Sequence, residues 1–414
     1  VLVILPRVKR VQKLTDNINL ISRENLTGIS VVHAYNAEEY QEDKFEKAND
    51  VLMRTQLFNQ RAMALLMPAV GLAMNALSLT IYWVGAAIVN RVSATDLAGR
   101  ISTFGDIVVF GTYATYIIMS LMMLVMILVL LPMAQVSAVR INEVLDAPIS
   151  LHEGKMTEAP EQGTVEFRDV SFRYPSSSGD VLEHVSFRAN KGETIAFIGA
   201  TGSGKTTLVS LAARFYDATE GQVLIDGQDV RSYSFDALYD RIGYVTQRAI
   251  VFAGDVRSNV LFGESSAPQD DESVQRALSL AQATEFVDKL PGKLDAPIAQ
   301  AGANVSGGQK QRLSIARALA RKPEILIFDD SFSALDYRTD ASLRAGLARE
   351  LSDTTCLIVA QRIGTIRHAD RIVVLDEGRV AGIGTHDELM KNCGVYREIA
   401  MSQLSAAELE KEGV

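Results

Sequence analysis

The sequence predicts an α-helical transmembrane domain, present in part, followed by an α/β domain built around a phosphate-binding P-loop. Two long stretches without a charged residue lie in the first third of the chain, at 62–90 and 107–139. A glycine-rich loop, Gly199 to Thr206, stands between an apolar run and a helical pattern. Apolar runs and helical patterns alternate through the rest of the chain, as is typical of an α/β domain with a parallel sheet.

The composition limits the classes of protein to consider. With 414 residues the chain is long enough for two or three domains. Its net charge of −9 gives no support for nucleic-acid binding, which usually requires a basic surface. Two cysteines are too few for a disulfide framework, and no signal-peptide pattern opens the chain. Cys356 stands in an apolar, strand-like run, so we expect a buried, reduced thiol in a cytosolic domain.

Each uncharged stretch exceeds the ~20 residues that a helix needs to cross a bilayer. We therefore expect membrane spans at about 62–90 and 107–133, because two uncharged runs of this length argue against the alternative of buried core helices. The stretch that precedes them is much richer in Lys and Arg than the segment 91–106 between them. By the positive-inside rule, the preceding stretch is cytoplasmic and segment 91–106 is an extracellular loop.

Residues 7–61 are charged and helical in pattern, which predicts cytoplasmic helical extensions of the spans. A turn between two such helices is expected at Gly28 to Tyr35, where the lone His33 is interpreted as a surface or packing residue and not as a ligand. The apolar run Val1 to Leu5, which begins without a methionine, has the pattern of the end of a further span.

The loop at 199–206 has the complete Gly-x-x-x-x-Gly-Lys-Thr spacing of a P-loop. The apolar run Thr194 to Ile198 predicts a strand before it, and Thr206 to Ala213 predicts a helix after it. Glycines let several backbone N–H groups point at one phosphate chain, and the helix N-terminus adds its dipole. Lys205 supplies a charge for the β- and γ-phosphates, and Thr206 a hydroxyl for Mg²⁺. The spacing in this context argues against a chance glycine turn and predicts nucleotide binding.

The α/β domain is expected to follow a linker at 147–163, which contains Pro148, Gly154 and Pro160. Val165 to Phe172 alternates irregularly between apolar and polar residues, which we interpret as an edge strand. Tyr174 follows this strand. Its ring either stacks on a purine or packs at the end of the strand.

Two shorter strands are expected after the P-loop helix. Gln222 to Ile225 predicts a strand that turns at Asp226-Gly227, a dipeptide typical of hairpins. Ile242 to Val245 predicts another strand, which is followed by Gln247. A glutamine at a strand end near phosphates can contact Mg²⁺ or the attacking water, although this signal is weak by itself.

A second anion-binding element is predicted at Asn304 to Arg312. Ser306 is placed to cap a helix that runs to about Arg321. Its hydroxyl, the amides of Gly307 and Gly308, and the helix dipole together favour a bound anion. An ordinary capped helix is the alternative. Two anion sites in one chain suggest that both serve one ligand from opposite sides.

Acidic and amide side chains follow two further predicted strands. Glu324 to Phe328 is an apolar strand that ends in Asp329-Asp330, and an acidic residue in this place is a common Mg²⁺ partner of a P-loop. Thr354 to Ala360 is another apolar strand, and Gln361 follows it.

These motifs occur in the order found in ABC transporter ATPases, including a Ser-Gly-Gly-Gln signature at 306–309 and a Ser-Ala-Leu-Asp loop at 333–336. With spans ahead of the ATPase, the whole chain resembles an ABC exporter half-transporter. The resemblance implies a partial transmembrane domain at 1–146, an α/β P-loop ATPase domain of the ABC type at 164–404 and a tail at 405–414. A half-transporter of this family has six spans, so the first three are expected to be missing from this chain.

In this family two ATPase domains meet head to tail, and each ATP lies between the P-loop of one and the signature of the other. Carried over, the resemblance implies that Tyr174 stacks on adenine and that Asp336 crosses the dimer interface. Phosphate contacts are implied for Gly199, Thr201, Gly202, Ser203, Gly204, Lys205, Thr206 and Thr207. Contacts to the partner's nucleotide are implied for Ser306, Gly307, Gly308 and Gln309, and Mg²⁺ contacts for Thr206, Gln247 and Asp329.

The resemblance also implies partners and a location. Gly28 to Tyr40 resembles the coupling helix that docks on an ATPase domain. The expected partners are a second half-transporter, the lipid bilayer and a transported substrate that the sequence does not identify. The expected location is the plasma membrane of a bacterium, crossed several times, with the ATPase domain in the cytoplasm.

Two positions depart from the family pattern. The family usually has Glu after the strand aspartate, as the base for water, and His after the last core strand. This chain has Asp330, one methylene shorter, and Gln361, which cannot take up a proton in the same way. Asp330 could still serve as the base after a small shift. A chain that has lost both residues but keeps an intact signature resembles the degenerate-site subunit of a heterodimeric exporter.

Losing general-base chemistry costs on the order of 10²–10⁴ in rate. We therefore hypothesise that the P-loop site of this chain binds ATP and hydrolyses it slowly, with Asp330, Gln361 and Gln247 as its catalytic residues. The signature would complete a competent site on a different partner chain. Two alternatives stay open: a homodimeric exporter that hydrolyses ATP at two Asp330 sites, and a regulatory subunit in which ATP is only a clamp. The uncharged spans disfavour a soluble ABC protein of DNA repair or translation.

Overall fold

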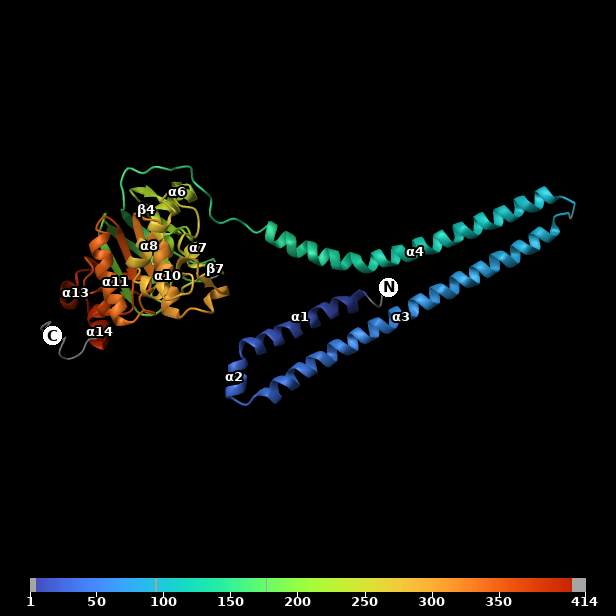
Figure 1. The fold of residues 1–414 in the computed structure, drawn as a ribbon, viewed down its shortest axis with the longest axis horizontal. Helices are drawn as coiled ribbons and strands as arrows, with labels where there is room; N and C mark the ends of the chain where they lie inside the picture. The colour runs from blue at the N-terminus through green and yellow to red at the C-terminus, as the bar shows by residue number, and fades with distance from the viewer. Residues whose placement is uncertain (1–4, 94, 176, 404–414) are drawn as a thin grey trace. The chain divides into compact units, whose positions relative to one another are not determined.

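The structure of the protein is a computed structural model that describes residues 5–93, 95–175 and 177–403 (Figure 1). It divides into two compact units, and the boundary along the chain lies between Pro148 and Ile149. Of the apolar run expected to end a further span, residues 1–4 lie outside the described part, as does the expected tail at 405–414.

The first unit consists of helices that form antiparallel hairpins (Figure 1). These helices are α1 (Leu5–Thr27), α2 (Ile29–Ala34), α3 (Glu38–Arg91) and α4 (Leu97–Leu145). The last part of the charged extension, from Glu38, and the uncharged run of the first expected span form one continuous helix, the 54-residue α3. In the described residues, two helical segments are long and apolar enough to cross a membrane, Pro68–Arg91 and Leu97–Leu124.

The connection between α3 and α4 is shorter than the expected loop at 91–106. α4 already begins at Leu97, because Asp96 caps it by accepting a hydrogen bond from the Gly99 N–H at 2.9 Å. Most of the residues that we expected in the loop are therefore helical, and α3 ends at Arg91.

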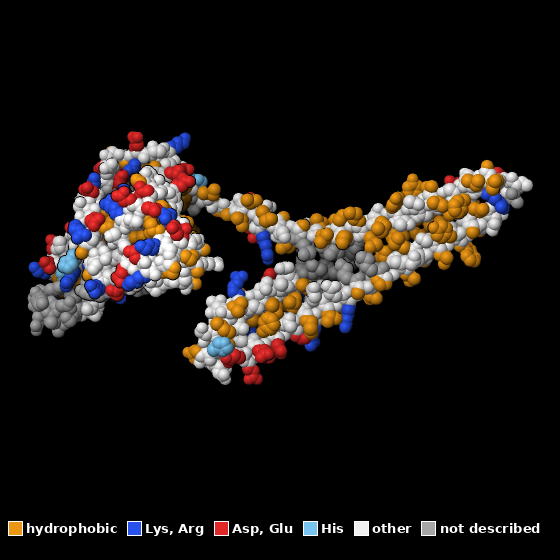
Figure 2. All heavy atoms as spheres, viewed as in Figure 1, with side chains coloured by type: hydrophobic (Ala, Val, Ile, Leu, Met, Phe, Trp, Pro, Cys, Tyr) orange, Lys and Arg blue, Asp and Glu red, His pale blue; other side chains and the backbone are white. Residues whose placement is uncertain are grey.

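Polar and apolar side chains separate along the first unit. On the face shown in Figure 2, charged side chains gather around α2 and the adjoining ends of α1 and α3, and hydrophobic side chains predominate along the coloured parts of α3 and α4 beyond them. At the charged end, Lys44 of α3 lies 2.8 Å from Glu24 of α1. The expected turn at 28–35 contains the short helix α2, and His33 is exposed there, with its Nδ1 2.6 Å from Glu38 Oε1.

The strands of the second unit form two main sheets within the described residues. The antiparallel sheet has the order β2 (Leu182–Ala189), β1 (Val165–Phe172), β4 (Glu220–Ile225) and β5 (Gln228–Asp229). The larger sheet has the order β12 (Arg379–Gly384), β11 (Arg371–Asp376), β3 (Thr194–Gly199), β10 (Thr355–Val359), β9 (Ile325–Asp329) and β6 (Ile242–Val245). All its neighbours pair in parallel except β11 with β12, so the expected parallel core is confirmed. A small antiparallel pair joins β7 (Gly254–Asp255) to β8 (Pro297–Ile298).

The interpretation of Val165 to Phe172 as an edge strand is wrong. β1 lies between β2 and β4 and pairs with both of them. Its irregular alternation comes from register shifts between Phe167 and Val170, where Asp169 has a left-handed φ of 51°. Bulges of this kind displace the inward–outward pattern by one residue, which imitates a poorly patterned edge.

Helices pack on both faces of the six-stranded sheet. The helices of the second unit are α5 (Lys205–Ala212), α6 (Phe235–Arg241), α7 (Val256–Val260), α8 (Asp271–Leu280), α9 (Thr284–Asp288), α10 (Gly307–Ala320), α11 (Tyr337–Glu350), α12 (Ile363–Ile366), α13 (His386–Asn392) and α14 (Gly394–Gln403). Successive residues of β9, Ile327 and Phe328, belong to separate hydrophobic clusters on the two sides of the sheet. A strand buried on both faces is apolar throughout, which explains the uninterrupted runs in the sequence. Cys356 is buried as expected, and burial raises the pKa of its thiol to about 12.

Residues 149–163, expected to be part of a linker, are held on the second unit. Met156 forms a strand-like bridge with Tyr233. Arg214, which is 1% exposed, donates a hydrogen bond from Nη2 to the His152 carbonyl at 2.7 Å. Because Arg214 stands just after α5, the helix that starts at the P-loop leads directly to the residue that anchors this segment.

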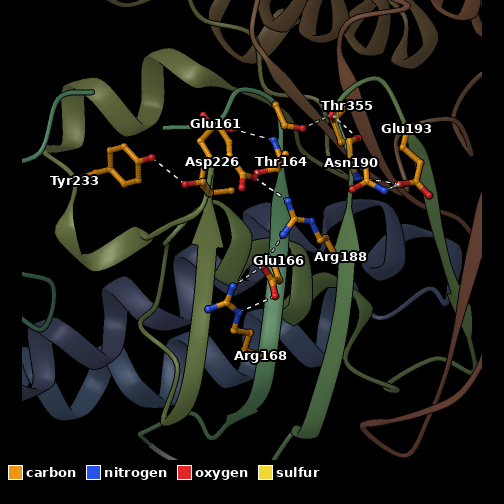
Figure 3. A network of polar contacts seen from close by, with 12 residues as sticks. Glu161, Thr164, Glu166, Arg168, Arg188, Asn190, Glu193, Asp226, Tyr233 and Thr355 are labelled. Atoms are coloured by element: carbon orange, nitrogen blue, oxygen red, sulfur yellow. Dashed lines mark hydrogen bonds and ion pairs between the residues drawn. The ribbon is translucent and has the colours of Figure 1, made fainter. Parts of the chain in front are cut away.

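An ion-pair ladder fixes the end of the same segment, as Figure 3 shows. Arg188 of β2 lies 2.8 Å from Glu161 and 3.3 Å from Glu166 of β1. Arg168 Nε lies 2.6 Å from Glu166 Oε1 and lowers the pKa of that carboxyl. Single exposed pairs contribute little, but a ladder that shares its members restrains the segment more than one pair does.

Asp226 ends β4 as a buried carboxylate in the expected turn, with φ values of 54° at Asp226 and 77° at Gly227. Its Oδ1 accepts a hydrogen bond from the Thr164 N–H at 2.9 Å (Figure 3). Asp226 Oδ2 and Glu324 Oε2 are both buried without a hydrogen-bond partner among the described residues. Burial, and secondarily the Glu324 carboxylate, raise the pKa of Asp226 to about 6.

We expect Asp226→Asn to stabilise the protein at pH 8 by about 1–3 kcal/mol and to have little effect near pH 4. The raised pKa means that the folded chain binds this proton more tightly than the unfolded chain. The wild-type protein therefore loses stability as the pH rises from about 4, the ordinary value, to about 6. Asparagine keeps the acceptor for Thr164 and presents an N–H toward Glu324. Thermal unfolding at both pH values measures the effect, and an equal gain at both would contradict it.

Candidate functional site

The P-loop curls around the side chain of its own lysine. Gly202 and Gly204 have φ values of 87° and 95°, and a Cβ at Gly204 would lie 2.6 Å from Leu182 Cδ2. Lys205 Nζ donates hydrogen bonds to the carbonyls of Gly199 at 2.9 Å and Ala200 at 2.7 Å. Burial lowers the pKa of Lys205, and the nearby aspartates oppose this shift. The loop therefore holds a cation at the N-terminus of α5, which suits a polyphosphate.

A cavity of about 340 Å³ opens beside the P-loop. It brings together expected site residues from four parts of the chain, namely Thr201, Gly202, Gly204, Lys205, Thr206, Thr207, Gln247, Asp330 and Gln361. Ser203 is buried behind the loop, where its Oγ accepts from Lys205 Nζ at 3.3 Å. The strand ends and the P-loop thus converge as the motifs predict.

Asp329, at the end of β9, forms the expected pair with the P-loop. Thr206 Oγ1 donates a hydrogen bond to Asp329 Oδ1 at 2.8 Å, and the Tyr244 hydroxyl donates to Oδ2 at 3.3 Å. Burial raises the pKa of Asp329, and these two hydrogen bonds oppose the shift. A hydroxyl and a carboxylate are the oxygen ligands that Mg²⁺ prefers, so the residues fit this ion. Sequence reasoning missed Tyr244, which the alternation of its strand directs toward Asp329.

Asp330 is held by two glutamines. Gln361 Nε2 donates to Asp330 Oδ2 at 2.8 Å, and Gln247 Nε2 donates to the same oxygen at 3.2 Å. Asp330 itself has a left-handed φ of 46°, and its N–H donates to the Val359 carbonyl at 3.0 Å. Burial raises the pKa of Asp330, and the two amides oppose the shift. Gln247, expected near Mg²⁺, contacts Asp330 in this structure instead of Asp329.

The signature residues stand apart from this cavity. Ser306 caps α10 as expected, with its Oγ accepting from the Gln309 N–H at 3.3 Å. The Gln309 Oε1 accepts from the Ser306 N–H at 2.8 Å, so the Gln309 side chain completes a capping box. Ser306 and Gly307 are exposed, Gly308 is half-buried, and none of them lines the cavity beside the P-loop.

Two more expected nucleotide contacts have partners within the chain. Asp336 caps α11 by accepting from the Thr339 N–H at 3.0 Å, which lowers the pKa of Asp336. The Tyr174 hydroxyl lies 3.0 Å from Thr207 Oγ1, and its ring meets Tyr216 edge to face at a centroid distance of 5.2 Å. Tyr174 is thus next to the P-loop helix, whereas Asp336 is exposed and does not line the cavity.

Comparisons with known proteins agree in both units. The description "ABC transporter" matches residues 182–333, and "ABC transporter transmembrane region" matches residues 4–139. An uncharacterized ABC transporter ATP-binding protein of Mycobacterium tuberculosis is 40% identical over 409 residues, which cover 97% of this chain and 68% of the relative. An ATP-dependent lipid A-core flippase of Aromatoleum aromaticum is 34% identical over 406 residues, 98% of this chain and 66% of the flippase. A solved structure of a bacterial Atm1-family ABC exporter with ATP bound is similar with a TM-score of 0.79 at 28% identity, over 97% of this chain and 70% of that chain.

Proposed function

The chain belongs to the ABC transporter family, as an exporter subunit with a transmembrane region and an ATPase domain, and from this premise we propose that it pairs with a different half-transporter. Its own P-loop site binds ATP and hydrolyses it slowly. Its signature completes the competent site on the partner, and hydrolysis there drives a substrate across the membrane.

The observation that carries this proposal is the setting of Asp330. Both glutamines donate to its Oδ2, at 2.8 Å and 3.2 Å, and so occupy the lone pairs of that oxygen. The amide of Gln361 cannot accept a proton from water in place of the carboxylate, whereas an imidazole in that position could. The two hydrogen bonds stabilise the ionised carboxylate and oppose the rise of its pKa, so they make Asp330 a weaker general base than an unheld carboxylate in the same place.

The chain's own residues hold the nucleotide in this proposal. Lys205 and the N-terminus of α5 bind the β- and γ-phosphates, and Tyr174 offers an aromatic face to adenine. Thr206, Asp329 and Gln247 serve Mg²⁺, which neutralises charge on the phosphates when it is bound.

The signature acts on the partner's nucleotide. Ser306 and Gly307 are exposed at the N-terminus of the 14-residue α10, so their hydroxyl and amide are free to meet a γ-phosphate on another chain. ATP held between both chains favours the closed pair, and ADP favours it less, so hydrolysis shifts the population toward the open pair. We propose that α2, in the segment 28–40, transmits this change by docking on an ATPase domain.

A homodimer that hydrolyses ATP at two identical sites is the second candidate. It is favoured by one observation: Asp330 lines the same cavity as Lys205, so its carboxylate faces the phosphate-binding loop. In that case a small movement away from the glutamines would free the base.

Steady-state ATP hydrolysis by the full-length protein, purified alone and returned to lipid, tests the proposal. We expect nucleotide binding with slow turnover, and Lys205→Ala should abolish the binding. Lys191→Ala, which removes an exposed lysine from the turn before β3, is the matched control and should change neither. Brisk turnover that depends on Lys205 would contradict the degenerate site and support the homodimer.

A further inference from the structure

The last described residue of the C-terminal helix reaches the loop that carries Gln361. Gln403 Nε2 donates a hydrogen bond to the Gln361 carbonyl at 2.8 Å. Gln403 Oε1 accepts a hydrogen bond from the Ile363 N–H at 2.9 Å. One carboxamide thus bridges the backbone on both sides of Arg362, where the chain leaves β10 and enters α12.

This bridge supplies what the local sequence lacks. Arg362 is the N-cap residue of α12, and its side chain makes no capping hydrogen bond. A helix start leaves backbone N–H groups without partners, and Gln403 supplies an acceptor for one of them from a distant helix. Only this contact ties the Gln361 carbonyl to α14 among the described hydrogen bonds.

The position of Gln403 is set by the hydrophobic core. α14 buries Tyr396 and Ala400 completely, and it packs against α12, β3 and β11. Gln403 lies one turn beyond Ala400 at the exposed end of the helix. The buried face of α14 therefore holds the carboxamide of Gln403 in place, although the Gln403 side chain itself is exposed.

We propose that Gln403 is a positioning residue for the ATP site. It fixes the backbone at 361–363 so that the Gln361 side chain reaches Asp330 Oδ2, which lies 2.8 Å away. The inference rests on the proposed function, because it assigns the orientation of Asp330 a role in the slow hydrolysis at this site. It makes the C-terminal helix a part of the catalytic apparatus that no motif marks.

The test uses the full-length chain, assembled with its partner in lipid and photolabelled with a radioactive azido-ATP. The measured quantity is the rate at which nucleotide on this chain is converted to ADP in one turnover. Gln403→Ala should speed conversion about three- to tenfold, the change expected from the loss of two backbone hydrogen bonds, because a Gln361 side chain that is no longer held in place releases Asp330 Oδ2. ATP binding should not weaken. In a Gln361→Ala background, Gln403→Ala should have no further effect, because its action passes through Gln361.

A readout independent of turnover follows the Ile363 amide by hydrogen exchange. Gln403→Ala should speed the exchange of this amide. Gln403→Glu keeps the acceptor, and so the protection, but it loses the donor to Gln361 and should therefore also speed conversion. Ser402→Ala is the matched control, because Ser402 Oγ donates only to the Ile399 carbonyl of the same helix. An unchanged rate in Gln403→Ala, or the same acceleration in the Gln361→Ala background, would overturn the inference. Rapid conversion by the wild-type chain would instead overturn the proposed function, so the two failures are distinguishable.

Discussion

Replacement of Asp330 by glutamate is expected to speed ATP hydrolysis at this chain's own site by roughly 10²-fold, the lower end of the range for general-base catalysis. The extra methylene extends the carboxylate into the cavity and past the two amides that hold Asp330 Oδ2. Addition of Gln361→His should raise the rate further, because an imidazole can accept a proton and the amide cannot. Single-turnover conversion of ATP to ADP on this chain, assembled with its partner, measures the change.

Asp340→Glu is the matched control for this experiment. Asp340 is also a buried aspartate, but it is paired with Arg344 at 3.0 Å and does not line the cavity. The same added methylene at this position should leave hydrolysis unchanged. If Asp330→Glu also has no effect, the identity of the base does not limit the rate, and the explanation of slow hydrolysis is wrong.

Ser306→Asp is expected to reduce the turnover of the assembled pair by roughly 10²–10³, the loss typical for removal of a group that stabilises charge in a transition state. Aspartate caps a helix as well as serine does, so α10 should remain folded. The new carboxylate, however, stands at the exposed helix end that would meet the partner's γ-phosphate, where like charges repel. Steady-state ATP hydrolysis by the pair measures the loss, and thermal unfolding verifies the fold.

Thr385→Asp separates the effect of the charge at the signature from the effect of a new acidic cap. Thr385 caps α13 with a capping box of the same kind, formed with Glu388. Its replacement should leave turnover intact. If turnover also survives Ser306→Asp, the signature of this chain is not a catalytic element. The alternative of a regulatory subunit, in which ATP is only a clamp, is then favoured.

Local patterns sufficed for much of the fold. The strand Ile242–Val245, the turn at Asp226-Gly227 and the cap at Ser306 lie where the sequence predicts them. Each depends on residues within a few positions of one another, so the sequence contains the whole cause. The prediction that β1 is an edge strand was wrong, because the position of a strand depends on which distant strands pair with it. A bulge had also altered the alternation of polar and apolar residues in β1.

The sequence by itself determined the class of the protein, because the P-loop spacing, the uncharged spans and the helix caps are local properties of the chain. Only the tertiary structure decided what surrounds Asp330. The parallel registers of β6 and β10 on either side of β9 bring Gln247 and Gln361 to one carboxylate oxygen. Gln403 reaches the same loop through the packing of α14 on the core. Contacts between residues tens of positions apart follow from strand order and burial, and no short pattern encodes them.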